Sequence, residues 1–159
     1  MLPGAMRRVR STKCRSSRTF PGQSFSTSER TASGANCLVV SSGFRELIEP
    51  VLEREGLAGL ELLANTVDPD PAGWRVSFRD ESICDSCGEA CKRTTVAALA
   101  DGREVVYVGD GFSDRCAAED AQLVFARRGL AAYLSERGVP FEPFDDFFQI
   151  AHTIVTAPS

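Results

Sequence analysis

Residues 105–114 read Val-Val-Tyr-Val-Gly-Asp-Gly-Phe-Ser-Asp, a short apolar run that leads into glycines and two aspartates. The run predicts a buried strand, and the glycines predict a tight turn after it. Asp110 and Asp114 would then follow the carboxyl end of the strand, which is the edge where α/β sheets bind ligands. Two carboxylates at this edge suit Mg²⁺, a cation that prefers oxygen ligands. The stretch therefore indicates an α/β fold with a candidate magnesium site.

Apolar strands alternate with amphipathic helices through residues 37–159, which predicts an α/β fold with a parallel sheet. Strands are expected at residues 37–40, 60–65, 104–108 and 123–126, with a hairpin return strand at 74–78. Helices are expected at residues 44–55, 91–100, 114–120, 130–137 and from 144 onward. Pro50 is expected to kink or split the first helix. Residues 68–73 are expected to form a turn, and residues 140–143 a linker.

The charge distribution divides the chain near residue 36. Residues 1–36 hold seven Lys or Arg and one acidic residue, whereas residues 37–159 hold eleven basic and twenty-one acidic residues. The first segment lacks apolar periodicity, so we expect a disordered basic tail (1–36) before one domain (37–159). Such a tail is compatible with a transit peptide, with non-specific binding to nucleic acid or membrane, or with a wrongly placed start of the gene model. We favour the wrongly placed start, for a reason that the motifs below provide.

Polar residues follow two further expected elements. Ser41, Ser42 and Gly43 end the first strand, and Lys92 begins a helix. In a parallel sheet these residues would meet the two aspartates at one edge. A serine hydroxyl, a helix N-terminus and a lysine bind phosphate oxygens, while carboxylates hold Mg²⁺. The alternative interpretation is structural: a serine that satisfies backbone groups, a solvated lysine, a turn aspartate and a helix cap.

Together these segments resemble three motifs of the haloacid dehalogenase superfamily. Residues 39–44 are similar to its second motif, with Ser41 as phosphate ligand, while Lys92 is similar to the lysine of its third motif. The GDGxSD stretch is similar to its fourth motif, with Asp110 and Asp114 as metal ligands. The similarity covers about residues 37–150. It is greatest to the branch of phosphoserine phosphatase-like enzymes and the methionine-salvage phosphatase acting on 2-hydroxy-3-keto-5-methylthiopentenyl-1-phosphate.

The resemblance implies a three-layer Rossmann-like core with a parallel sheet, Mg²⁺ as cofactor, and hydrolysis of a small phosphorylated metabolite. One motif of the superfamily has no counterpart, because its nucleophile is the first Asp of a DxDxT segment and residues 1–36 contain no aspartate. We therefore expect an N-terminally truncated core that lacks the usual first strand and cap, with impaired catalysis. The alternative is a non-catalytic pseudoenzyme that binds metal or phosphate, or a partner-binding module. The strands left without a neighbour predict marginal stability and self-association.

Three cysteines, Cys84, Cys87 and Cys91, have a spacing similar to that of a metal knuckle. The sequence does not identify a fourth ligand; Cys116 is a candidate, and free structural thiols are an equally good interpretation. Because the chain shows no secretory signal, we expect a reduced, cytoplasmic setting without a disulfide framework.

The remaining aromatic and histidine residues predict no chemistry. His152 is expected to have a surface or packing role, and Trp74 and the phenylalanines of 141–148 are expected in the core or on a helix face. No apolar stretch reaches the about 20 residues of a membrane span. No specific nucleic-acid partner is expected either.

Overall fold

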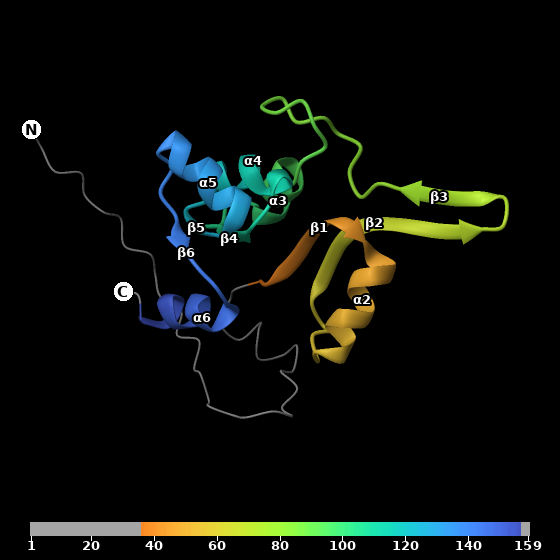
Figure 1. Ribbon diagram of the computed structural model, residues 1–159, viewed down its shortest axis with the longest axis horizontal. Coiled ribbons are helices and arrows are strands. Elements are labelled where there is room, and N and C mark those ends of the chain that lie inside the picture. The colour runs from red at the N-terminus through yellow and green to blue at the C-terminus, as the bar shows by residue number, and fades with distance from the viewer. Residues whose placement is uncertain (1–35, 157–159) are drawn as a thin grey trace, which may run out of the picture.

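A computed structural model of the chain describes residues 36–156, so the expected basic tail lies outside the described residues apart from Asn36. The strands form two three-stranded sheets, ordered β1–β2–β3 and β4–β5–β6 (Figure 1). The elements in chain order are β1 (Leu38–Phe44), α2 (Arg45–Arg54), β2 (Glu61–Asp70), β3 (Gly73–Ser77), α3 (Arg93–Ala100), β4 (Val106–Gly109), the 3₁₀ turn η1 (Phe112–Asp114), α4 (Arg115–Asp120), β5 (Leu123–Ala126), α5 (Arg128–Arg137), β6 (Glu142–Pro143) and α6 (Phe147–Thr156).

The first sheet, together with α2, forms an N-terminal unit (residues 38–77). β1 and β2 pair in parallel, and β2 then continues into an antiparallel hairpin with β3. The predicted turn at 68–73 is too long, because antiparallel pairing persists to Asp70 opposite Gly73. Only Pro71 and Ala72 remain as the turn. Pro50 does not split α2, which is one helix from Arg45 to Arg54.

The second sheet, with α3 to α6, forms a C-terminal unit (residues 84–156) in which all three strands are parallel. Successive residues of β5 alternate between its two faces, as strand geometry requires. Val124 and Ala126 pack with Leu130 and Leu134, which α5 supplies. Phe125 instead packs on the other face, against Phe144 and against Ile150 of α6. Helices therefore cover both faces of this sheet, as expected. β6 lies inside residues 140–143, for which the sequence predicts a linker.

The parallel α/β core expected from the sequence is present, but among the described residues its strands fall into two sheets, because β1 and β4 do not pair with each other. Each of these strands is the edge of its own sheet (Figure 1). A missing first strand predicts either that two inner strands lack a ladder partner or that they pair directly, and within residues 36–156 the first alternative holds. The backbone groups along one side of β1 and one side of β4 have no strand neighbour among residues 36–156.

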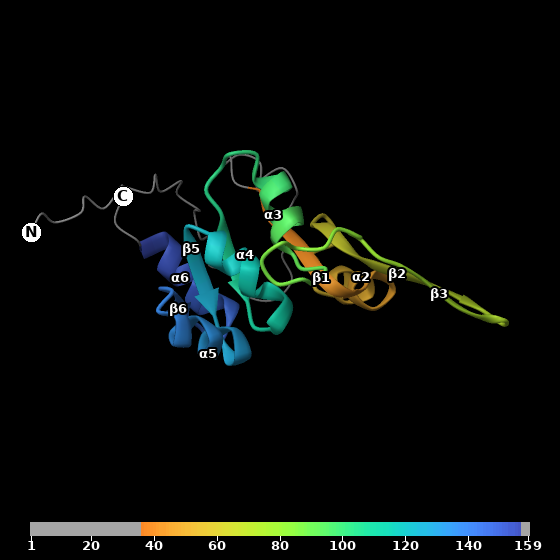
Figure 2. The same ribbon diagram turned by 90° about the horizontal axis from the view of Figure 1, so that it is seen from above.

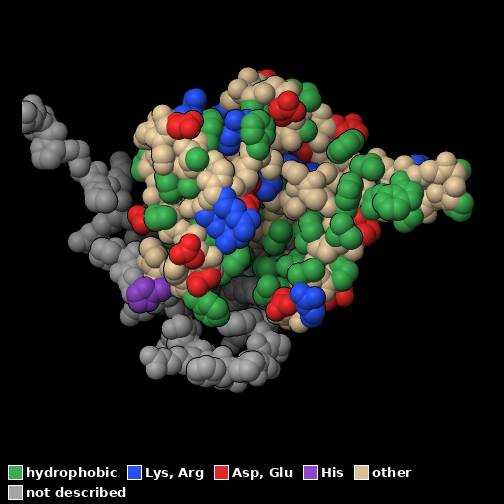
Figure 3. Space-filling view, in the orientation of Figure 1, with side chains coloured by type: hydrophobic (Ala, Val, Ile, Leu, Met, Phe, Trp, Pro, Cys, Tyr) green, Lys and Arg blue, Asp and Glu red, His purple; other side chains and the backbone are tan. Residues whose placement is uncertain are grey.

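The β2–β3 hairpin projects from the body of the molecule (Figure 2). Its aromatic residue Trp74 is 73% exposed, so the expectation of a core or helix-face position for this residue is wrong. Exposed hydrophobic side chains lie at a few places on this projection, among backbone and other side chains (Figure 3). Phe147 and Phe148 are also exposed on α6, whereas Phe144 is buried as expected. Among residues 36–156, no helix combines the length and the apolar character needed to cross a bilayer.

Candidate phosphate and metal site

The GDGxSD stretch forms a turn that closes around the carboxylate of Asp114. This carboxylate is buried, and its Oδ2 accepts hydrogen bonds from the backbone N–H groups of Asp110 (3.1 Å) and Gly111 (2.9 Å). Glycine suits position 109, because a Cβ there would lie 2.9 Å from the Asp114 side chain and force a shift. The local sequence thus shapes the turn around one acid.

The other oxygen of Asp114 binds a cation and a phenol. Lys92, at the start of α3, places its Nζ 2.6 Å from Oδ1, and the hydroxyl of Tyr107 on β4 donates to the same oxygen at 2.8 Å. Burial by itself raises the pKa of Asp114, but the Lys92 charge and the hydrogen bonds outweigh burial and lower the pKa below its ordinary value. Burial, followed by the charge of Asp114, raises the pKa of Tyr107 well above the usual range, so the phenol remains a donor.

Asp110 lies beside Asp114 but in a different environment. Its side chain is 46% exposed, and its Oδ2 is 3.3 Å from Nη1 of Arg128 and 4.0 Å from Nε of Arg127. Arg128 adopts a left-handed backbone conformation (φ 52°), which is unusual for a residue other than glycine. The Nε of Arg127 is buried and has no hydrogen-bond partner among the described residues. Asp110 therefore offers half-exposed oxygens next to two cations.

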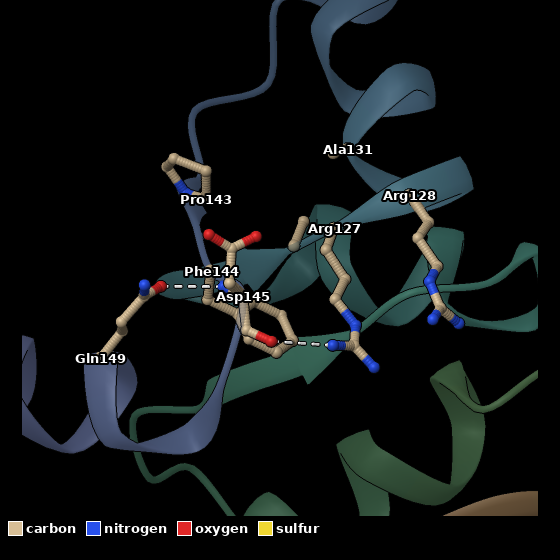
Figure 4. Close-up of a pocket in the computed structure, with 8 residues that line it drawn as sticks. Arg127, Arg128, Ala131, Pro143, Phe144, Asp145 and Gln149 are labelled. Atoms are coloured by element: carbon tan, nitrogen blue, oxygen red, sulfur yellow. Dashed lines mark hydrogen bonds between the residues drawn. The ribbon is translucent and has the colours of Figure 1, made fainter.

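The two arginines also line a hollow of about 410 Å³ between β5, α5 and the segment before α6 (Figure 4). There Nη1 of Arg127 donates to the backbone carbonyl of Asp145 at 3.0 Å, while Gln149 accepts from the Asp145 N–H. These bonds fix the arginine between the hollow and the Asp110 carboxylate.

Ser41 belongs to the other unit, and one guanidinium links it to the Lys92 region. Arg79 donates from Nε to the carbonyl of Ser41 (3.2 Å), from Nη1 to the hydroxyl of Thr95, and from Nη2 to the carbonyl of Cys91 (3.1 Å). The hydroxyl of Ser41 itself accepts from the Gly43 N–H at 3.0 Å. The Arg79 side chain therefore links β1 to the region where α3 begins.

The other two predicted phosphate ligands lie next to Ser41 on β1. Ser42 accepts a hydrogen bond at its carbonyl from the Asn65 side chain (2.9 Å), and Gly43 is exposed. The structure thus brings Lys92, Asp110 and Asp114 together around the end of β4. Among the described residues no hydrogen bond joins Ser41, Ser42 or Gly43 directly to that group. Their roles in binding stay predictions.

Sequence reasoning did not anticipate four residues of this region: Arg79, Tyr107, Arg127 and Arg128. Tyr107 carried a signal, since it is the polar member of an otherwise apolar strand ending at the motif. Arg79 carried none, because its three acceptors lie 38, 16 and 12 residues away along the chain. His152 lies exposed on α6, as expected for a surface residue.

The cysteines form a second group next to the first. The sulfur atoms of Cys84, Cys87, Cys91 and Cys116 all lie within 4.8 Å of one another. Hydrogen bonds from backbone N–H groups lower the pKa of Cys84, whereas burial raises the pKa of Cys91 and Cys116. The structure therefore places Cys116, which the sequence could only suggest. The five described cysteines are free.

Comparison with known proteins assigns the family. The family model of the haloacid dehalogenase-like hydrolases matches residues 5–119. This chain belongs to that family. The match begins in the segment before the described residues and ends within α4, so it includes the GDGxSD turn and the Lys92 region.

Curated relatives agree with this assignment. A polyol phosphate phosphatase of Saccharomyces cerevisiae is 33% identical over 127 residues, and the match covers 71% of this chain and 53% of the yeast protein. A 2-hydroxy-3-keto-5-methylthiopentenyl-1-phosphate phosphatase of Microcystis aeruginosa is 31% identical with the same coverage. The corresponding protein of Exiguobacterium sibiricum is 27% identical, with coverage of 79% and 58%. The chain therefore spans about half the length of the curated relatives it matches.

Proposed function

We propose that this chain carries the phosphate- and magnesium-binding part of a hydrolase that acts on small phosphomonoesters. The observation that supports this most directly is the Lys92–Asp114 pair at the carboxyl end of β4, with the half-exposed Asp110 beside it. A largely enclosed lysine next to acids at a sheet edge is a suitable arrangement for a charged ligand and its counter-ion. The family assignment and the phosphatase names of the relatives support the same conclusion.

Each residue has a proposed role in binding. Lys92 offsets the phosphate charge, and the backbone and hydroxyls at Ser41, Ser42 and Gly43 donate to phosphate oxygens from the β1 side. Among these residues, Lys92 is the one that we propose to contact the phosphoryl group while the ester bond is cleaved. Its side chain is 13% exposed, so its charge acts in surroundings that screen it weakly.

The oxygen donors of the site fit Mg²⁺. Asp110 is the direct ligand that we propose, because its carboxylate is half exposed and its partner Arg128 is an exposed side chain that a cation would displace. Asp114 is the second proposed ligand, and both of its oxygens already accept two hydrogen bonds each. It therefore reaches the ion through water or by exchanging one donor. The ion, when bound, neutralises phosphate charge.

The substrate class that we propose is a small phosphorylated metabolite, in line with the names of the two phosphatases that this chain resembles. A second function class, a non-catalytic module that binds phosphate or metal, follows from a different observation. Residues 1–36 contain no aspartate, and no DxDxT segment occurs elsewhere in the sequence. Binding without turnover is the outcome that this second class predicts.

A binding experiment tests the shared part of both functions. Inorganic phosphate with Mg²⁺ should raise the Tm of the full chain, as a ligand of the folded state does. Ser41→Ala removes one exposed hydrogen bond and should weaken phosphate binding about tenfold, the effect of losing about 1.4 kcal/mol. Ser135→Ala, at an exposed position of α5, is the matched control and should leave binding unchanged. No phosphate-dependent shift in the wild-type chain would contradict both functions.

A turnover experiment separates the two classes. The full chain is mixed with, or fused to, a segment that carries a DxDxT motif, and release of phosphate from an aryl phosphate is measured. The hydrolase proposal expects turnover that depends on Mg²⁺ and falls in Lys92→Met. Phosphate binding without turnover under these conditions would leave the non-catalytic module as the function.

A further inference from the structure

We propose that Cys84, Cys87, Cys91 and Cys116 form a structural zinc site that is separate from the proposed magnesium site. Their four sulfur atoms lie within 4.8 Å of one another, and none of them is in a disulfide. In a zinc tetrathiolate, Zn–S bonds of about 2.3 Å place the sulfurs about 3.8 Å apart, so the widest pair needs to close by about 1 Å. Side-chain rotations alone produce movements of this size.

The backbone of residues 84–88 has the shape of a metal-binding knuckle. The Gly88 N–H donates to the carbonyl of Cys84 at 2.8 Å, and the Cys84 N–H donates to the carbonyl of Glu89 at 3.0 Å. Gly88 has a φ of +70°, a conformation that glycine adopts without strain. This tight loop directs the sulfurs of Cys84 and Cys87 to the same point. An unpartnered pair of thiols does not require so constrained a loop.

The other two sulfurs come from elements that carry the candidate phosphate site. Cys91 directly precedes Lys92, and its sulfur accepts a hydrogen bond from the Arg93 N–H at 3.4 Å. Donors of this kind stabilise a metal-bound thiolate. Cys116 lies on α4, two residues after Asp114. Zinc would thus connect α4 to the loop before α3 and hold the two partners of the Lys92–Asp114 ion pair in register.

The ligand set identifies the metal class. The cluster contains only sulfur donors, with no carboxylate or imidazole, and soft thiolates in a compact tetrahedron select Zn²⁺ over Mg²⁺. Three of the four cysteines are buried, which suits a closed structural site without an open coordination position. A hollow of about 150 Å³, lined by Cys87, Cys91 and Cys116, borders the cluster and gives the ion a route of entry.

Metal analysis of the full chain tests the proposal. The chain is purified under reducing conditions from cells grown with zinc, and its metals are measured by inductively coupled plasma mass spectrometry. We expect about one zinc per chain, as for a closed Cys₄ site. Cys116→Ser should lower the zinc content about tenfold, since it removes a ligand. Cys37→Ser changes an exposed cysteine outside the cluster and should retain all of the zinc.

Cobalt gives a second readout, which is made first on the wild-type chain itself. Co²⁺ added to the metal-free, reduced wild-type chain should saturate at one equivalent, with a sulfur-to-cobalt charge-transfer band and the intense visible bands of a tetrahedral site. Zinc should displace it. Cys116→His should restore metal binding with visible bands shifted to shorter wavelength, because one sulfur is replaced by nitrogen.

Three results would overturn the inference: iron in place of zinc, two disulfides in the purified chain, or a reduced chain that binds neither zinc nor cobalt. None of these measurements uses a phosphorylated compound. The zinc site can therefore fail while the proposed phosphatase function stands, and the reverse is also true.

Discussion

The N-terminal and C-terminal units differ in how much apolar surface they bury. No residue of α2 or β3 is buried, and Leu62 and Ala64 are the buried residues that β2 supplies. In the C-terminal unit, by contrast, Phe125, Leu130 and Leu134 are almost completely enclosed. Since apolar burial is the main stabilising contribution to a fold, the C-terminal unit is the more stable of the two.

This difference divides the candidate site as well. Lys92, Asp110 and Asp114 belong to the well-packed unit, whereas Ser41 belongs to the unit with little core. The position of Ser41 relative to Lys92 therefore depends on polar contacts, chiefly those of Arg79. The proposed metal ligands therefore lie in the unit with the larger core, and the β1 residues lie in the unit whose position depends on polar contacts.

The largest expected effect compares one leucine in each unit. Leu134→Ala in α5 leaves a cavity in a fully buried position and should lower the free energy of unfolding by about 3 kcal/mol. Leu47→Ala in α2 changes a side chain that is 70% exposed and should stay within about 0.5 kcal/mol. Urea denaturation followed by circular dichroism measures both. Equal losses for the two variants would contradict the contrast between the units.

A smaller effect is expected where the units meet. Arg79→Met leaves the carbonyls of Ser41 and Cys91 without their donor and should cost about 2 kcal/mol, the range for hydrogen bonds from a charged group. Hydrogen exchange should become faster in β1 and β2 but not in β5. Arg75→Met is the control, because Arg75 is 75% exposed and makes only loose pairs with Asp68 and Asp70. Faster exchange that is uniform over both units would show that Arg79 has no special role at their junction.

A third comparison lies within the C-terminal unit. A Cβ at Gly109 would lie 2.9 Å from Asp114, so Gly109→Ala should distort the acidic turn and destabilise the chain by about 1 to 2 kcal/mol. A Cβ at Gly129, in α5, would lie no closer than 3.7 Å to any neighbour, so Gly129→Ala should be neutral or slightly stabilising. Thermal unfolding of both variants measures the difference. A neutral Gly109→Ala would mean that the turn accommodates a side chain.

Local pattern predicted the C-terminal unit better than the N-terminal one. The strand at 123–126 was predicted with its observed bounds, because a short apolar run between polar residues is typical of a buried strand. The hairpin was predicted, yet the length of β2 was not, since Pro69 and Asp70 favour turns and only pairing with β3 keeps them extended. The separation into two sheets follows from strand pairing, which no local pattern specifies.

The same limit applies to the candidate site. The sequence indicated the Asp110 and Asp114 turn through its glycines, and Lys92 through its place between the cysteine cluster and the following helix. Arg79 was not evident, because its three bonds join segments that are distant in sequence. Cys116 could be named as a candidate but not placed, since the sequence alone does not show whether its side chain faces the other three cysteines.

The smallest expected effect concerns how the free energy of unfolding depends on pH. Asp114 should make a contribution to this dependence that can be told apart from that of other acids. The Lys92 pair lowers the pKa of Asp114 in the folded state, so its stabilisation is fully present above the unfolded value of about 3.9. It is lost as the pH falls through the lower, folded pKa. Hydrogen bonds from Ser82 and Thr94 lower the pKa of Asp80 in the same direction, so the wild-type profile contains both contributions.

Asp114→Asn removes one contribution and leaves the other. Urea midpoints measured between pH 7 and pH 3 should fall less in Asp114→Asn than in the wild type, and the difference should appear only below about pH 4. Asp80→Asn should remove a separate contribution, because the partners of Asp80 are Ser82, before α3, and Thr94, in α3, rather than residues of the turn. Parallel profiles for wild type and Asp114→Asn would mean that Lys92 does not hold the charged carboxylate in the folded chain.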